Sequence, residues 1–218
     1  MNSRYQDWLK HAFDHEVTDK ISQWYFAEDA PLFETTDNEM TELISQTFLN
    51  VDKDLTKYLD EQIDQGIWYL AGTSGSDFMS ALASSEVPLP KRLEAIGSIY
   101  YLYSDCFAQR CAEVLGHLSD EGSPLNSSCY MFWDIFRFSG LEDILKNKET
   151  QDAVLNVLEK TLAIEHVACR EGALHELGHT AKSCPEKVRE IIDVFLSKNK
   201  LDDNLMAYAL KAREGMVL

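Results

Sequence analysis

Residues 166–198 read HVACREGALHELGHTAKSCPEKVREIIDVFLSK, and this stretch is the most informative about the fold. Its apolar residues recur at spacings of three and four, which is the period of an amphipathic helix. Pro185 suits the first turn of a helix, because proline has no backbone N–H that would be left unpaired there. The stretch therefore predicts two helices, over about 166–183 and 185–198.

The segments on either side continue this pattern. A helix is predicted over about 150–164 and another over about 202–216, where Asp202 or Asp203 can cap the first turn. The first and third of the four helices start about 35 residues apart, and the second and fourth about 36. A period of that length indicates two successive helical hairpins.

The residues of these hairpins resemble those of HEAT/armadillo-like helical repeat proteins. The run from Arg170 to His179, followed by Pro185 and the segment 188–192, is similar to the second helix of one repeat leading into the first helix of the next. The resemblance covers about 150–218. It implies stacked α-hairpins, which in that family usually serve as protein-binding scaffolds.

Residues 1–148 are also predicted to be helical, but they show no clear repeat. The longest helical stretch runs from Pro88 to about Leu115 and carries an aromatic-rich stripe typical of a core helix. Only ten Gly and five Pro occur in 218 residues, which is few for a fold of many short strands. We therefore expect a single all-α unit, in which an irregular helical portion (1–148) packs on two HEAT-like α-hairpins (149–218) of an α-α superhelix.

The charge of the chain restricts its partners. The formal net charge is −17, and such a surface repels the phosphates that supply most nucleic-acid affinity. Between residues 1 and 66, fifteen acidic side chains face five basic ones. We therefore expect no nucleic-acid partner, and any partner protein drawn to this acidic third would be basic.

No targeting or membrane segment is apparent in the sequence. Residues 1–20 are rich in charge and lack the apolar core of a signal peptide. No apolar run approaches the roughly 18 residues that a membrane span needs. The five cysteines are odd in number and show no C-x-x-C spacing, which argues against disulfides and against a thiolate zinc site. We expect a cytoplasmic protein with reduced thiols and no membrane partner.

One motif could carry chemistry. His175, Glu176 and His179 form the pattern His-Glu-x-x-His, in which two imidazoles on one side of a helix can bind zinc and the glutamate can deprotonate a metal-bound water. Lys182 and Pro185 occupy the positions where metzincins have Gly and His. In a zinc site, the third ligand would then be Glu190 or Asp193, across a tight turn.

The same residues are also compatible with a repeat helix that is packed against its neighbours. On a helical wheel, His175 and His179 lie beside the core stripe and next to small residues such as Gly172, which would allow close helix packing. No strand precedes the motif to hold a peptide substrate, as zinc peptidases require. We therefore expect a non-catalytic scaffold that binds a protein or peptide and needs no cofactor. The alternative is a zinc-dependent hydrolase with Glu176 as general base and with His175, His179 and Glu190 as ligands.

Overall fold

The computed structural model describes residues 3–17 and 23–217, without the side chains of residues 138 and 139. Throughout these residues the regular structure is helical, and the predicted all-α class is confirmed.

The long helices are α1 (Ser3–Phe13), α2 (Asp37–Leu49), α4 (Asp60–Ala71), α5 (Leu89–Tyr101), α7 (Leu125–Phe136), α9 (Lys148–Leu162), α10 (Val167–Thr180), α11 (Pro185–Lys198) and α12 (Asp203–Arg213). Between them lie the short helices α3 (Val51–Asp54), α6 (Ala108–Arg110) and α8 (Glu142–Ile144), the 3-10 turns η1 (Trp24–Phe26), η2 (Phe78–Leu82) and η4 (Gly116–Leu118), and the π-helical segments η3 (Leu102–Phe107) and η5 (Arg137–Leu141).

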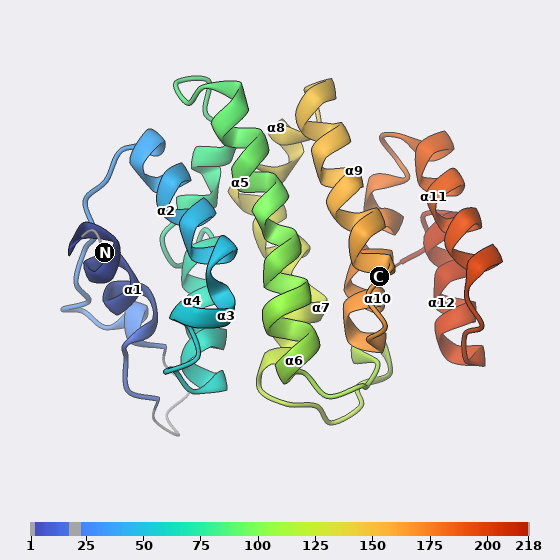
Figure 1. The fold of residues 1–218 in the computed structure, drawn as a ribbon, viewed down its shortest axis with the longest axis horizontal. Helices are drawn as coiled ribbons and strands as arrows, with labels where there is room; N and C mark the ends of the chain where they lie inside the picture. The colour runs from blue at the N-terminus through green and yellow to red at the C-terminus, as the bar shows by residue number, and fades with distance from the viewer. Residues whose placement is uncertain (1–2, 18–22, 218) are drawn as a thin grey trace.

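The long helices are arranged in two layers that follow the long axis of the molecule (Figure 1). Helices α2, α5, α9 and α11 are successive neighbours in one layer, and α1, α4, α7, α10 and α12 are successive neighbours in the other. The chain crosses between the layers from α2 to α4, from α5 to α7, from α9 to α10 and from α11 to α12. The alternation of the last two hairpins thus continues into the N-terminal portion, with irregular short segments between the long helices.

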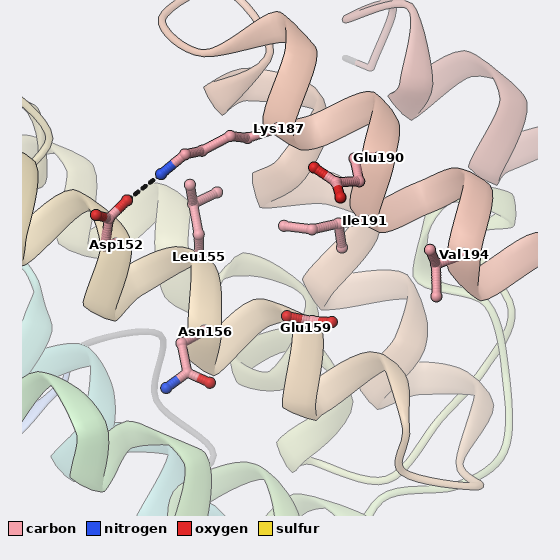
Figure 2. Close-up of a pocket in the computed structure, with 8 residues that line it drawn as sticks. All are labelled: Asp152, Leu155, Asn156, Glu159, Lys187, Glu190, Ile191 and Val194. Carbon is pink, nitrogen blue, oxygen red and sulfur yellow. Dashed lines mark hydrogen bonds and ion pairs between the residues drawn. The ribbon is translucent and has the colours of Figure 1, made fainter.

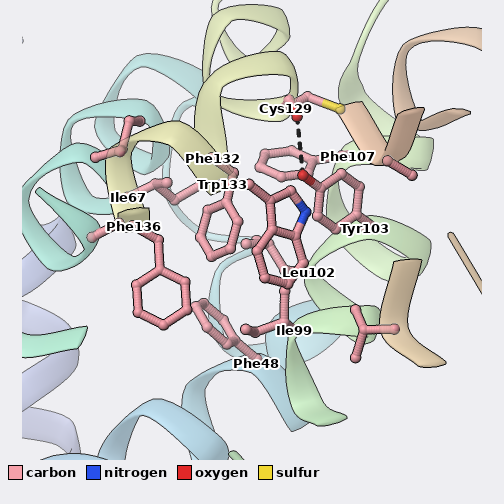
Figure 3. Packing of buried hydrophobic residues seen from close by; sticks show 14 of the residues in the cluster. Phe48, Ile67, Ile99, Leu102, Tyr103, Phe107, Cys129, Phe132, Trp133 and Phe136 are labelled. Carbon is pink, nitrogen blue, oxygen red and sulfur yellow. Dashed lines mark hydrogen bonds between the residues drawn. The ribbon is translucent and has the colours of Figure 1, made fainter. Parts of the chain in front are cut away.

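A continuous core separates the two layers. Its centre is aromatic, with Phe48 of α2, Tyr103 of η3 and Trp133 of α7 packed together (Figure 3). The Tyr103 hydroxyl, which is fully buried, donates a hydrogen bond to the carbonyl oxygen of Cys129 at 3.1 Å. The aromatic-rich stripe of the long helical stretch predicted from Pro88 is therefore part of the core.

The four predicted C-terminal helices are present, with ends within three residues of the predicted ones. Pro185 occupies the first turn of α11, as expected. Asp202 caps α12, because its carboxylate accepts hydrogen bonds from the backbone N–H groups of Asn204 and Leu205 at 2.9 and 3.1 Å. Local sequence signals thus place these helix ends.

The longest predicted helix ends earlier than expected, at Arg110 instead of Leu115. Beyond it, the side chain of Asn126 accepts a hydrogen bond from the backbone N–H of Ala112 and donates one to its carbonyl, both at 2.9 Å. This contact from α7 replaces the helical hydrogen bonds of Ala112, so the chain leaves the helix. A distant residue therefore decides this end.

Two further expectations concern membranes and thiols. Among the described residues, every helix falls short of the length and apolar character that a bilayer crossing demands. All five cysteines are free, and Cys106, Cys129 and Cys169 are buried.

Candidate functional site

Helix α10, which carries the His-Glu-x-x-His motif, is buried on almost every side. Several of its polar residues are enclosed as well, and His175 is only 1% exposed. Its glycines explain how its neighbours approach so closely. A Cβ on Gly172 would lie 2.6 Å from the carbonyl oxygen of Cys129, and one on Gly178 would lie 2.6 Å from the side chain of Val217. The close packing predicted beside the histidines is confirmed.

The two histidines of the motif meet an aspartate from α7. The Nε2 atom of His175 lies 2.8 Å from Oδ2 of Asp134, and Nε2 of His179 lies 3.4 Å from Oδ1 of the same carboxylate. The two Nε2 atoms are 3.2 Å apart. Asp134, His175 and His179 therefore point three potential metal-ligand atoms at one another, and we call them the ligand cluster.

The charges in the cluster act on one another. Burial lowers the pKa of His179. Burial alone would raise the pKa of Asp134, but the hydrogen bond and charge of His175 outweigh it and lower the pKa.

Two tyrosines extend the contacts of the cluster through His175. The Nδ1 atom of His175 lies 2.6 Å from the hydroxyl of Tyr208 on α12, whose oxygen is 3.1 Å from that of Tyr130 on α7. The ring of His117 stacks on Tyr208 with centroids 4.3 Å apart, and Glu171 accepts hydrogen bonds from the backbone N–H groups of Gly116 and His117. The orientation of His175 is thus held from both ring nitrogens.

Glu176, the general base of the hydrolase alternative, lies outside the ligand cluster. Arg137 donates to both of its oxygens, at 2.7 and 2.6 Å, and Thr180 donates to one of them at 2.6 Å. Burial raises the pKa of Glu176 to about 7, against the opposing charge of Arg137. Because both oxygens are engaged, in this structure Glu176 ties α10 to the end of α7.

The sequence suggested Glu190 or Asp193 as the third zinc ligand, but neither residue belongs to the ligand cluster. Glu190 lies on the exposed side of α11 and faces α9. Asp193 is paired with Arg213, with contacts of 2.6 and 2.9 Å. Asp134 takes the third position instead. Asp134 is the one charged residue in the otherwise apolar or neutral helix α7, and that isolation was the sequence signal that could have drawn attention to it.

A second feature is a surface groove between α9 and α11 (Figure 2). Its central part is a pocket of about 290 Å³, and neighbouring hollows extend it toward Cys184 at one end and toward Asn199 at the other. Leu155 of α9 and Ile191 and Val194 of α11 supply its apolar lining, and Val194 is 38% exposed. We call this feature the α9–α11 groove.

The charges along the α9–α11 groove are unevenly neutralised. At one end, Asp152 accepts contacts from both Lys148 and Lys187. Farther along, Glu159 of α9 and Glu190 of α11 border the apolar lining from opposite helices (Figure 2), and neither has an ion-pair partner among the described residues. The middle of the groove is therefore apolar with an acidic border.

No family model, curated protein or solved structure gave a significant match.

The two features differ in what they can do. The ligand cluster is compact and mostly enclosed, which suits a single ion. The α9–α11 groove is elongated and open, which suits a segment of another polypeptide.

Proposed function

We propose that the chain is a HEAT/armadillo-like helical array that acts as a non-catalytic scaffold and binds a basic, amphipathic helical segment of a partner protein in the α9–α11 groove. The two-layer arrangement of hairpins supports the first part of the proposal, because stacked hairpins present elongated surfaces between successive helices. The groove between α9 and α11 supports the second.

The apolar lining with two unpaired carboxylates is the observation that carries the proposal. Leu155, Ile191 and Val194 offer an apolar strip to the corresponding face of an amphipathic helix. From Gln151 to Leu162 the groove follows α9 for about 16 Å, which matches about three turns of a bound helix. A helix that binds with its apolar side chains in the groove must also place the residues beside its apolar face next to Glu159 and Glu190.

Charge selects among amphipathic helices. Lys or Arg on the flanks would pair with Glu159 and Glu190, whereas acidic flanks would be repelled. The net charge of −17 also speeds the encounter with a basic partner. The same reasoning disfavours nucleic acid as the occupant.

The proposal is tested with two synthetic helical peptides that share one apolar face and differ only in Lys-rich or Glu-rich polar faces. Fluorescence anisotropy should detect binding of the basic peptide alone. Val194→Asp should abolish it, and the double variant Glu159→Gln/Glu190→Gln should weaken it and reduce its salt dependence. The control is Glu61→Gln/Glu86→Gln, which makes the same charge change at exposed sites away from the groove. Equal binding of both peptides, or equal effects of the two double variants, would refute the proposal.

A further inference from the structure

We propose that the ligand cluster of Asp134, His175 and His179 binds one zinc ion that fastens α7 to α10. This site is separate from the α9–α11 groove, so it extends beyond the scaffold function and stands or falls independently of it. The cluster combines two imidazoles with one carboxylate, and this set of donors suits zinc. Magnesium and calcium prefer oxygen ligands instead.

The spacing of the donor atoms fits zinc. Ligands about 2.0–2.1 Å from a tetrahedral zinc ion lie about 3.3–3.4 Å from one another. The closest contacts in the cluster are 2.8 Å from His175 to Oδ2 of Asp134, 3.4 Å from His179 to Oδ1 of Asp134, and 3.2 Å between the two imidazoles. With one donor atom taken from each residue, the three atoms lie within 4.8 Å of one another, so small side-chain movements would bring them to the spacing that zinc requires.

Without an ion, the carboxylate of Asp134 can accept from both imidazoles, through Oδ2 from His175 at 2.8 Å and through Oδ1 from His179 at 3.4 Å. This arrangement leaves the two Nε2 atoms only 3.2 Å apart, each carrying a hydrogen. A cation between the donors can replace these hydrogens, because each nitrogen and the carboxylate can then point a lone pair at it.

The surroundings match those of a metal-bound histidine. Such a histidine usually donates its other ring N–H to a fixed acceptor, which sets the tautomer. Nδ1 of His175 has that partner in the Tyr208 hydroxyl at 2.6 Å, and Tyr208 can pass its own hydrogen to Tyr130 at 3.1 Å. With Nδ1 as the donor to Tyr208, Nε2 of His175 can give its lone pair to an ion that displaces the hydrogen it otherwise shares with Asp134.

The cluster is enclosed on one side and reachable on the other. The side chain of His175 is 1% exposed, whereas those of His179 and Asp134 are 24% and 20% exposed. An ion can therefore enter along the His179 side, and a water molecule can complete its coordination there. With Glu176 held by Arg137, this water has no free neighbouring glutamate as a base, so the ion is assigned a structural role.

The experiment uses the full chain, purified without a histidine tag and freed of metal with a chelator. Zinc, magnesium and calcium chloride are titrated separately by calorimetry, and bound zinc is quantified after dialysis. We expect about one equivalent of zinc, an increase in melting temperature with zinc, and no response to magnesium or calcium. Absence of zinc binding by the folded protein would overturn the proposal.

Variants identify the ligands. His179→Ala and Asp134→Ala, both at partly exposed positions, should lose the bound zinc and the thermal shift while remaining folded by circular dichroism. Glu190→Ala and His15→Ala are controls that should keep both. Zinc retained by Asp134→Ala, or lost from Glu190→Ala, would assign the ion to another ligand set and overturn the proposal. Peptide binding at the α9–α11 groove by His179→Ala should be unchanged, which separates the two proposals.

Discussion

Arg137 donates hydrogen bonds through one guanidinium nitrogen to both carboxylate oxygens of Glu176, at 2.7 and 2.6 Å. Glu176 is fully buried, and Arg137 also reaches the exposed carboxylate of Glu142. The residue that the motif suggests as a catalytic base is thus the inner half of an ion pair between α10 and the end of α7.

Removing Glu176 should destabilise the fold. Glu176→Ala leaves the Arg137 guanidinium without its buried partner, and we expect the free energy of unfolding to fall by about 3–5 kcal/mol. Glu142→Ala removes the exposed partner of the same arginine and should cost less than about 1 kcal/mol. Urea denaturation of both variants measures the difference, and similar losses would show that the buried pair has no special weight.

Two glycines in long helices should respond in opposite ways to alanine. At Gly172, a Cβ would lie 2.6 Å from the Cys129 carbonyl oxygen, so Gly172→Ala should destabilise the protein by about 1–3 kcal/mol. Gly97 of α5 has open space at that position, and Gly97→Ala should stabilise by about 0.5–1 kcal/mol because alanine favours the helix. Thermal denaturation of the pair tests this, and a stabilising Gly172→Ala would contradict the close approach of α7 and α10.

The cap of α12 distinguishes two adjacent aspartates. Asp202 accepts hydrogen bonds from two backbone N–H groups of the first turn, so Asp202→Ala should cost about 1 kcal/mol. Asp203→Ala, at an exposed position inside the first turn, should cost less. Chemical denaturation gives both values, and a reversed order would place the cap at Asp203.

Asp64 should make stability depend on pH. Burial raises the pKa of this carboxyl to about 6, although Ser128 donates a hydrogen bond to it at 2.5 Å. Its folded-state pKa exceeds the unfolded value, so its contribution to stability is fully present below the unfolded pKa and is lost as the pH rises through 6. The free energy of unfolding of Asp64→Asn, relative to that of the natural protein, should therefore be higher at about pH 7.5 than at about pH 5. Urea denaturation at both pH values measures this change, and a pH-independent difference would contradict the raised pKa.

The Tyr208 hydroxyl should tune the proposed zinc site. Tyr208→Phe removes the partner of His175 Nδ1 and should weaken zinc binding by about 10-fold, because a hydrogen bond to the other ring nitrogen fixes the orientation of a ligand imidazole. Tyr130→Phe alters only the next contact in the chain and should have a smaller effect. Calorimetric titration of both variants tests the order, and equal affinities in the natural protein and Tyr208→Phe would show that Tyr208 does not orient the ligand.

Some features of this protein follow from the sequence alone. Helix period, a proline in a first turn and an aspartate before a helix act over a few residues, and they predicted the helices between 148 and 213 and their ends. The spacing of His175 and His179 likewise places both imidazoles on one side of α10, because residues four apart lie one above the other on a helix. Such signals are local and remain valid in any tertiary arrangement.

The tertiary structure alone decided what those local elements meet. Asp134 lies 41 residues before His175 and Arg137 lies 39 before Glu176, and only the packing of α7 against α10 brings each pair into contact. The groove likewise depends on how α9 and α11 lie against each other, which no residue pattern within either helix specifies. Contacts between distant segments are set by how whole helices pack on a shared core, so the third partner of the histidines and the proposed binding surface emerged only with the fold.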